Sequence, residues 1–141
     1  MTLEYEKSQS KNEPGGVTTM DEKKKTILIY SPDLNFCFSL SMLFQDRYNV
    51  ITTTSSSMLE ELVTHYAASL LIVDASPTEK LIRLLHHVKE LNTDLPIIMV
   101  YVYSTKDSGL DAIARNEVDS VFYKPFDLSA MSKRINELLP V

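Results

Sequence analysis

The stretch "SLLIVDASP", residues 69–77, decides how the chain is interpreted. Its four consecutive apolar residues run straight into an acid, Asp74, which small residues and a proline follow. An apolar run without polar alternation is typical of a central strand covered by helices on both faces. Asp74 is therefore either the first residue of a turn or part of a functional site at the end of that strand.

Length, charge and cysteine content limit the kinds of protein that this chain can be. With 141 residues and 44% hydrophobic content, the chain has the size of one ordinary domain. The formal net charge of −5 argues against nucleic-acid and anionic-membrane partners, because phosphates attract basic patches. A single cysteine, Cys37, cannot form an internal disulfide, and no apolar run approaches the roughly 20 residues of a spanning helix. We therefore expect a cytoplasmic protein with no membrane segment.

The chain divides at about residue 26. Residues 1–25 mix charged residues, Ser, Thr, Pro14 and two glycines with almost nothing to bury, which predicts a disordered tail. Residues 26–141 alternate short apolar runs with segments of helical periodicity, which is the pattern of strand-helix units around a parallel sheet. We predict one folded domain with five strands, at 26–30, 49–53, 69–74, 96–102 and 120–124.

The five helices are predicted from their start signals and apolar faces. Ser31 is expected to cap the first helix, with Pro32 and Asp33 in its opening turn. Ser57 and Glu60 have the spacing of a capping box for the second. The third is expected at about 78–91, the fourth at 108–116, and the fifth from Asp127. We expect these faces to bury Phe36, Leu40, Leu43, Phe44, Leu59, Leu62, Val63, Leu81, Leu84, Leu85, Val88, Leu91, Leu128, Met131, Ile135 and Leu138.

Five alternating strands and helices predict a doubly wound, flavodoxin-like α/β fold, in which ligands bind beyond the carboxyl ends of the strands. Three polar side chains are expected at that edge. Asp74 ends the third strand, Lys124 ends the fifth in "FYKPFD", and Asp33 follows the first in "YSPD". An acid from the third strand should therefore face an amine from the fifth.

With "LLIVD" and "KPF" in this order, residues 26–139 resemble the receiver domain of two-component response regulators. The resemblance implies a (βα)5 receiver fold and a signalling role in a phosphorelay, with phosphoryl transfer from a histidine kinase to an aspartate. Asp74 falls on the phosphoacceptor position, and Lys124 falls on the lysine that holds a phosphoryl oxygen. A magnesium ion bound by an acidic pair after the first strand is also implied.

The acidic pair is missing from this chain. Its two positions fall on Ser31 and Pro32, and the nearest acid, Asp33, comes one residue later. Because Mg²⁺ is usually held by carboxylates with phosphate and water, only Asp74 and Asp33 remain as weak candidate ligands. A charge pair about 4 Å apart at an effective dielectric near 20 is worth roughly 4 kcal/mol before desolvation. We therefore expect magnesium binding to be doubtful, and Asp33 to open the helix instead.

The two switch positions also differ from the family. The small hydroxyl residue at the end of the fourth strand falls on Tyr101, and the mobile aromatic of the fifth falls on Val121. The loop after Asp74 is about three residues shorter than usual. We infer that the two positions have exchanged sizes, with the Tyr101 ring packed inward near Asp74 and the domain held in one conformation.

Three functions stay open. The first is an atypical receiver, or pseudo-receiver, that acts through protein contacts with phosphorylation weakened or lost. The second is a response regulator that accepts phosphate on Asp74. The third is a small flavodoxin-fold enzyme, which is disfavoured because "SPDLNF" has no glycine for a flavin phosphate and Ser76 stands where an aspartate phosphatase needs an acid.

We expect no enzyme activity and no resident cofactor. Output is expected through a protein partner, either a histidine kinase or an output protein. A homodimer through the fourth helix, fifth strand and fifth helix is the other expected contact, in the region from Leu110 to Arg134.

Overall fold

The computed structural model of the protein describes residues 24–140. The predicted tail therefore lies outside the described residues, apart from Lys24 and Lys25. Lys25 lies just before the first strand, where its ammonium group donates a hydrogen bond to the carbonyl oxygen of Pro140 at 2.9 Å.

The described chain forms one sheet of five parallel strands in the order β2-β1-β3-β4-β5, as the alternation of elements predicts. The strands are β1 (Thr26–Tyr30), β2 (Asn49–Thr53), β3 (Leu70–Asp74), β4 (Ile97–Tyr101) and β5 (Ser120–Tyr123). Each lies within one or two residues of its predicted bounds. Because all five run the same way, their carboxyl ends share one edge of the sheet.

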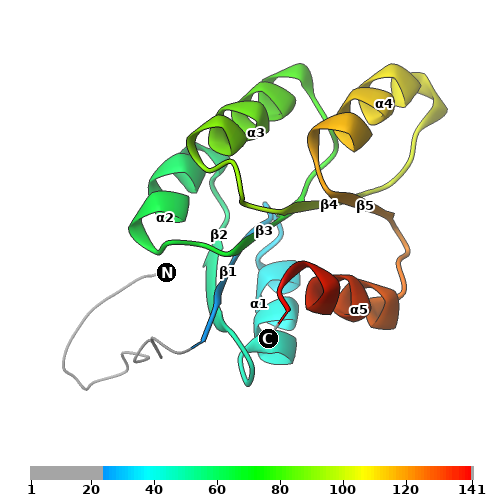
Figure 1. Ribbon diagram of the computed structural model, residues 1–141. Coiled ribbons are helices and arrows are strands. Elements are labelled where there is room, and N and C mark those ends of the chain that lie inside the picture. Colours follow the sequence, from blue (N-terminus) through cyan, green and yellow to red (C-terminus); the bar gives the residue numbers. More distant parts are fainter. Residues whose placement is uncertain (1–23, 141) are drawn as a thin grey trace.

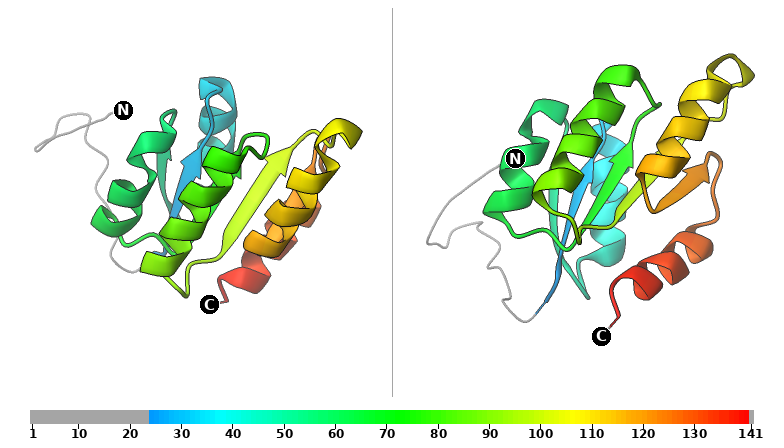
Figure 2. Two further views of the ribbon diagram at one scale, coloured as in Figure 1. Left: turned by 90° about the horizontal axis from the view of Figure 1, so that it is seen from above. Right: turned by 45° about the horizontal axis from the view of Figure 1, so that its top comes forward.

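Helices cover both faces of the sheet (Figures 1 and 2). They are α1 (Leu34–Phe44), α2 (Leu59–His65), α3 (Glu79–Leu91), α4 (Ser108–Glu117) and α5 (Leu128–Leu138), with short 3-10 turns at η1 (Ser56–Met58) and η2 (Thr105–Asp107). α1 and α5 lie on one face, and α2, α3 and α4 lie on the other. The described residues thus confirm the predicted doubly wound α/β fold.

Alternation along the strands divides the core in two. In β3, Leu71 and Val73 pack in the cluster under α2, α3 and α4, while Leu70 and Ile72 pack in the cluster with α1 and α5. All four are fully buried, as a central strand requires. Asp74 continues this strand to its carboxyl end.

Two predicted helix starts are wrong. α1 begins at Leu34, and its cap is Asp33, whose carboxylate accepts a hydrogen bond from the Asn35 N–H at 2.9 Å. Ser31 cannot cap the helix because its N–H donates to the Thr53 carbonyl and its hydroxyl is used at the sheet edge. The predicted capping box of Ser57 is replaced by η1, and α2 begins at Leu59 without a side-chain cap.

Three leucines that were expected to be buried are exposed. Leu43 is 43%, Leu91 is 58% and Leu128 is 41% exposed. Leu128 and Leu91 are the first residue of α5 and the last residue of α3, where a helix end extends past the sheet that it covers. Leu43 lies on the outer side of α1 with Phe38 and Met42, which are also exposed.

Within residues 24–140, no helix combines the length and apolar character that crossing a lipid bilayer requires.

Candidate functional site at the carboxyl edge of the sheet

Asp74 is a buried acid at the end of β3, with 6% of its surface exposed. Each of its two carboxylate oxygens has a partner. The ammonium nitrogen of Lys124 lies 2.6 Å from Oδ1, and the hydroxyl of Ser31 donates a hydrogen bond to Oδ2 at 2.7 Å. As predicted, the acid of the third strand faces the amine that follows the fifth.

Ser31 supplies the partner that sequence reasoning missed. It follows β1 directly, is fully buried, and links two elements. Its hydroxyl donates to Asp74 and accepts a hydrogen bond from the Asp33 N–H at 2.9 Å. One small side chain thus connects the end of β3 to the start of α1. The sequence did contain a sign of this contact: Ser31 can donate a hydrogen bond, and it stands at a position where the receiver family has an acid near the phosphoacceptor.

Lys124 contacts an aromatic ring, that of Phe36, as well as the carboxylate of Asp74. Its ammonium nitrogen lies 5.1 Å from the centre of the Phe36 ring, within the range of a cation–π contact. Phe36 is tilted against Phe126 at 6.4 Å between ring centres. The peptide bond between Lys124 and Pro125 is cis. The lysine is therefore placed from two sides, by a carboxylate and by a ring from α1.

The residues at this edge do not fit a magnesium ion. Both oxygens of Asp74 are engaged, and the carboxylate of Asp33 caps α1. Pro32 offers no side-chain oxygen, and Ser31 offers a hydroxyl that is already bonded on both sides. Among residues 24–140, no group of three or more His, Cys, Asp or Glu side chains is arranged to hold a metal ion. The two carboxylates present thus already have partners, and positions 31 and 32 supply none of the further carboxylates that Mg²⁺ prefers.

The switch positions lie on the other face of the sheet end, toward α4. Tyr101 is buried at the end of β4, in the core cluster with α3 and α4. Val121 is half-buried in β5 and packs against the same cluster. The hydroxyl of Tyr101 donates a hydrogen bond to Asp111 at 2.6 Å. The ring of Tyr101 is buried, as expected, but its hydroxyl bonds to an acid of α4 and not to Asp74.

Asp111 is a second buried acid that sequence reasoning missed. It is 4% exposed and lies in the first turn of α4. The hydroxyls of Tyr101 and Tyr123 both donate to its Oδ1, at 2.6 and 2.7 Å. Asp111, Ala114 and Val118 have helical spacing, and all three are buried. An acid in this apolar series was the signal that could have identified it.

Burial, hydrogen bonds and nearby charge together set the protonation states of Asp111, Tyr101 and Tyr123. Burial alone raises the pKa of Asp111, but the hydrogen bonds from Tyr101 and Tyr123 and the nearby Arg115 bring the pKa below its ordinary value. Burial and the bond to Asp111 raise the pKa of Tyr101 well above its ordinary range, and the pKa of Tyr123 shifts upward for the same reasons. The cluster is therefore one carboxylate with two neutral phenols.

Cys37 packs behind this edge as a small core residue. Its thiol lies 3.7 Å from the carbonyl oxygen of Ser31 and 3.9 Å from that of Thr53, within the range of weak hydrogen bonds to sulfur, and burial raises the pKa of the thiol. His86 and His87 are exposed on α3 and pair with glutamates of α2, α3 and α4.

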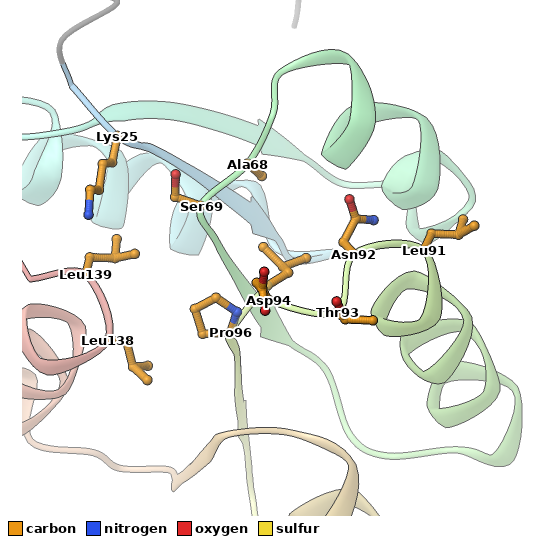
Figure 3. Close-up of a pocket in the computed structure, with 11 residues that line it drawn as sticks. Lys25, Ala68, Ser69, Leu91, Asn92, Thr93, Asp94, Pro96, Leu138 and Leu139 are labelled. Carbon is orange, nitrogen blue, oxygen red and sulfur yellow. The ribbon is translucent and has the colours of Figure 1, made fainter.

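A hollow of about 550 Å³ lies at the opposite end of the sheet. Its walls include Lys25, Ser69 and Pro96, which precede β1, β3 and β4, together with Leu138 and Leu139 (Figure 3). The hollow therefore lies at the amino ends of the strands and is separate from Asp74.

The fold resembles solved receiver domains. A response regulator receiver domain protein from Methanospirillum hungatei is 21% identical, with a TM-score of 0.72 over 82% of this chain and 94% of the other. A chemotaxis protein from Vibrio cholerae is 15% identical, with a TM-score of 0.68 over 82% and 98%. A protein from Burkholderia pseudomallei described as pilus-assembly-related is 20% identical, with a TM-score of 0.68 over 86% and 94%. No protein-family model and no curated protein sequence matches the chain.

These likenesses, with five parallel strands in one sheet and five helices, define the receiver fold of two-component response regulators. At 15–21% identity in these three comparisons, they show the architecture and leave the chemistry of the edge to be argued from its residues.

Proposed function

We propose that this protein is an atypical receiver-fold signalling module that acts through protein contacts, with phosphorylation of Asp74 and magnesium binding weakened or lost. One observation carries the proposal. Both oxygens of the Asp74 carboxylate are already bonded, one to Lys124 and one to Ser31. Ser31 stands at a position where the resemblance calls for a metal-binding acid.

The physical argument concerns charge. Attack of a carboxylate on a phosphodonor brings two negative groups together, so catalysis depends on positioning and on nearby positive charge. In this chain Lys124 supplies one positive charge, and it already neutralises Asp74. To act as a nucleophile, Asp74 must first give up its hydrogen bond from Ser31 and share Lys124 with the incoming phosphoryl group. Each step costs energy that a metal ion would otherwise offset.

The second candidate is a response regulator that accepts phosphate on Asp74 from a histidine kinase. The pairing of Asp74 and Lys124 at the carboxyl edge favours it, because both side chains are in place for an acceptor and a phosphoryl oxygen. A flavodoxin-fold enzyme is the weakest of the three, since the segment that follows β1 carries no glycine that lets the backbone wrap a phosphate.

Protein contact is proposed to occur on the face formed by α4, β5 and α5, either with an output protein or with a second copy. Several large apolar side chains on or beside these elements are exposed: Val102, Tyr103, Ile113, Tyr123 and Leu128. Exposed apolar side chains mark interaction surfaces where they are contiguous, as the rings of Tyr103 and Tyr123 are. Sedimentation velocity should show loss of self-association in Ile113→Asp but not in Phe38→Asp, an exposed position on α1. The reverse result would assign the contact to α1.

Labelling with a phosphodonor tests the proposal. The protein is incubated with acetyl phosphate and magnesium, and its intact mass is compared with that of Asp74→Asn under the same conditions. We expect no stoichiometric gain of a phosphoryl group in either protein. A base-labile gain in the wild type that disappears in Asp74→Asn would replace the proposal with the second candidate.

A further inference from the structure

The buried carboxylate of Asp111 joins three elements. Tyr101 from β4 and Tyr123 from β5 donate hydrogen bonds to its Oδ1, and the guanidinium of Arg115, one turn further along α4, lies 3.2 Å from its Oδ2. Asp111 itself belongs to α4 and is 4% exposed. The cluster lies at the same carboxyl edge as Asp74 but on the face covered by α4, and neither the fold comparison nor the proposed function accounts for it.

The pairing of β4 with β5 sets the arrangement of the two phenol rings, independently of their bonds to Asp111. Tyr101 and Tyr123 are register partners in the pairing of β4 with β5. Their rings pack edge to face, 5.7 Å apart between centres, and Tyr103 packs edge to face on Tyr123 at 5.4 Å. Because the strands set this arrangement, both hydroxyls reach one oxygen without ordering a flexible side chain at additional entropic cost.

The strength of the connection follows from charge. Hydrogen bonds to an ionised group are roughly twice as strong as those between neutral groups. Two such bonds run from α4 to the two strands beneath it. Apart from these bonds, α4 packs on the core through the buried Ala114 and the partly buried Leu110. The carboxylate therefore adds a polar anchor to the apolar packing of the first turn of α4.

We propose that Asp111, Tyr101 and Tyr123 form a lock that holds α4 against β4 and β5 in a single arrangement, whatever the state of Asp74. The lock occupies position 101, where the family resemblance implies the small hydroxyl residue of the switch. It fixes the orientation of the exposed α4 residues that a partner would meet. The lock does not depend on whether Asp74 accepts phosphate. An experiment can therefore disprove the lock without disproving the proposed function, and the reverse also holds.

Local motion of α4 tests the lock. Amide hydrogen exchange and NMR relaxation dispersion are measured on the wild type, on Asp111→Asn, and on Tyr101→Phe/Tyr123→Phe, which keeps both rings and removes both donors. Asp107→Asn is the matched control, because Asp107 lies at the same end of α4 and makes no side-chain cap bond. No phosphodonor or metal is added.

Amides of α4 should exchange on the order of tenfold faster in the two lock variants, with those of β1 and β3 unchanged. Millisecond exchange should appear in residues 102–117 of these variants and be absent from the wild type and from Asp107→Asn. If Asp111→Asn does not fold, the double phenylalanine variant decides the question. Uniform acceleration across the whole sheet, or millisecond exchange of α4 in the wild type, would overturn the lock.

Discussion

At the scale of single residues, the decisive feature is that Asp74 has a complete set of partners. A buried carboxylate is costly unless it is paired and hydrogen-bonded, and here Lys124 and Ser31 meet that requirement. The aromatic contact with Phe36 further restricts the lysine. The same contacts that stabilise the acid therefore compete with its use as a nucleophile.

Stability should show that Asp74 and Lys124 are coupled. Lys124→Met leaves a buried carboxylate with only Ser31 as its partner, so we expect the free energy of unfolding to fall by about 2 kcal/mol. Adding Asp74→Asn should recover part of this loss, giving a coupling energy of about 1–2 kcal/mol in a double-mutant cycle measured by urea unfolding. Lys106→Met, at an exposed lysine, should change stability by less than about 0.5 kcal/mol. Simple additivity of the two substitutions would show that the pair contributes nothing.

At the scale of elements, α4 depends on a charged group as well as on apolar packing. Its fold position could be predicted from the sequence, but its anchor could not, because the partners of Asp111 come from two strands. Tyr101 and Tyr123 are 22 positions apart and meet only through the register of β4 with β5. Periodicity assigns each residue to an element without assigning its partners across elements.

The pH dependence of stability should report on this anchor. The pKa of Asp111 lies below its ordinary value of about 3.9, so its contribution is complete above that pH and is lost as the pH falls through the lowered value. The difference in unfolding free energy between wild type and Asp111→Asn should therefore stay constant from pH 7 to about 4 and shrink as the pH is lowered further. A difference that stays constant below about pH 4 as well would mean that the ionised form of Asp111 is not the stabilising one.

The phenols act at the other end of the pH scale. The pKa values of Tyr101 and Tyr123 are raised, so their contribution is complete below about pH 10 and is lost as the pH rises further. The anchor is therefore intact throughout the neutral range.

At the scale of the whole molecule, sequence reasoning predicted the architecture and the meeting of Asp74 with Lys124, because strand order and strand ends follow from the alternation of apolar runs. It misplaced the start of α1, because Asp33 caps the helix, while the hydroxyl of Ser31 accepts from the Asp33 N–H and donates to Asp74, 43 positions away. It also predicted burial for Leu43, Leu91 and Leu128, since periodicity does not say which side of a helix faces the sheet or where the helix extends past it. Apart from the pairing of Asp74 with Lys124, contacts between distant elements were the part that one sequence could not supply.

A magnesium titration followed by NMR tests the central claim most directly, namely that the partners of Asp74 take the place of a metal site. In the wild type, the amides of residues 31, 33, 34, 74–76 and 124 should not shift saturably with millimolar magnesium. The variant Ser31→Asp/Pro32→Asp, which restores two carboxylates beside Asp74, should show saturable shifts at these positions. Saturable wild-type shifts centred on Asp74 would contradict the account.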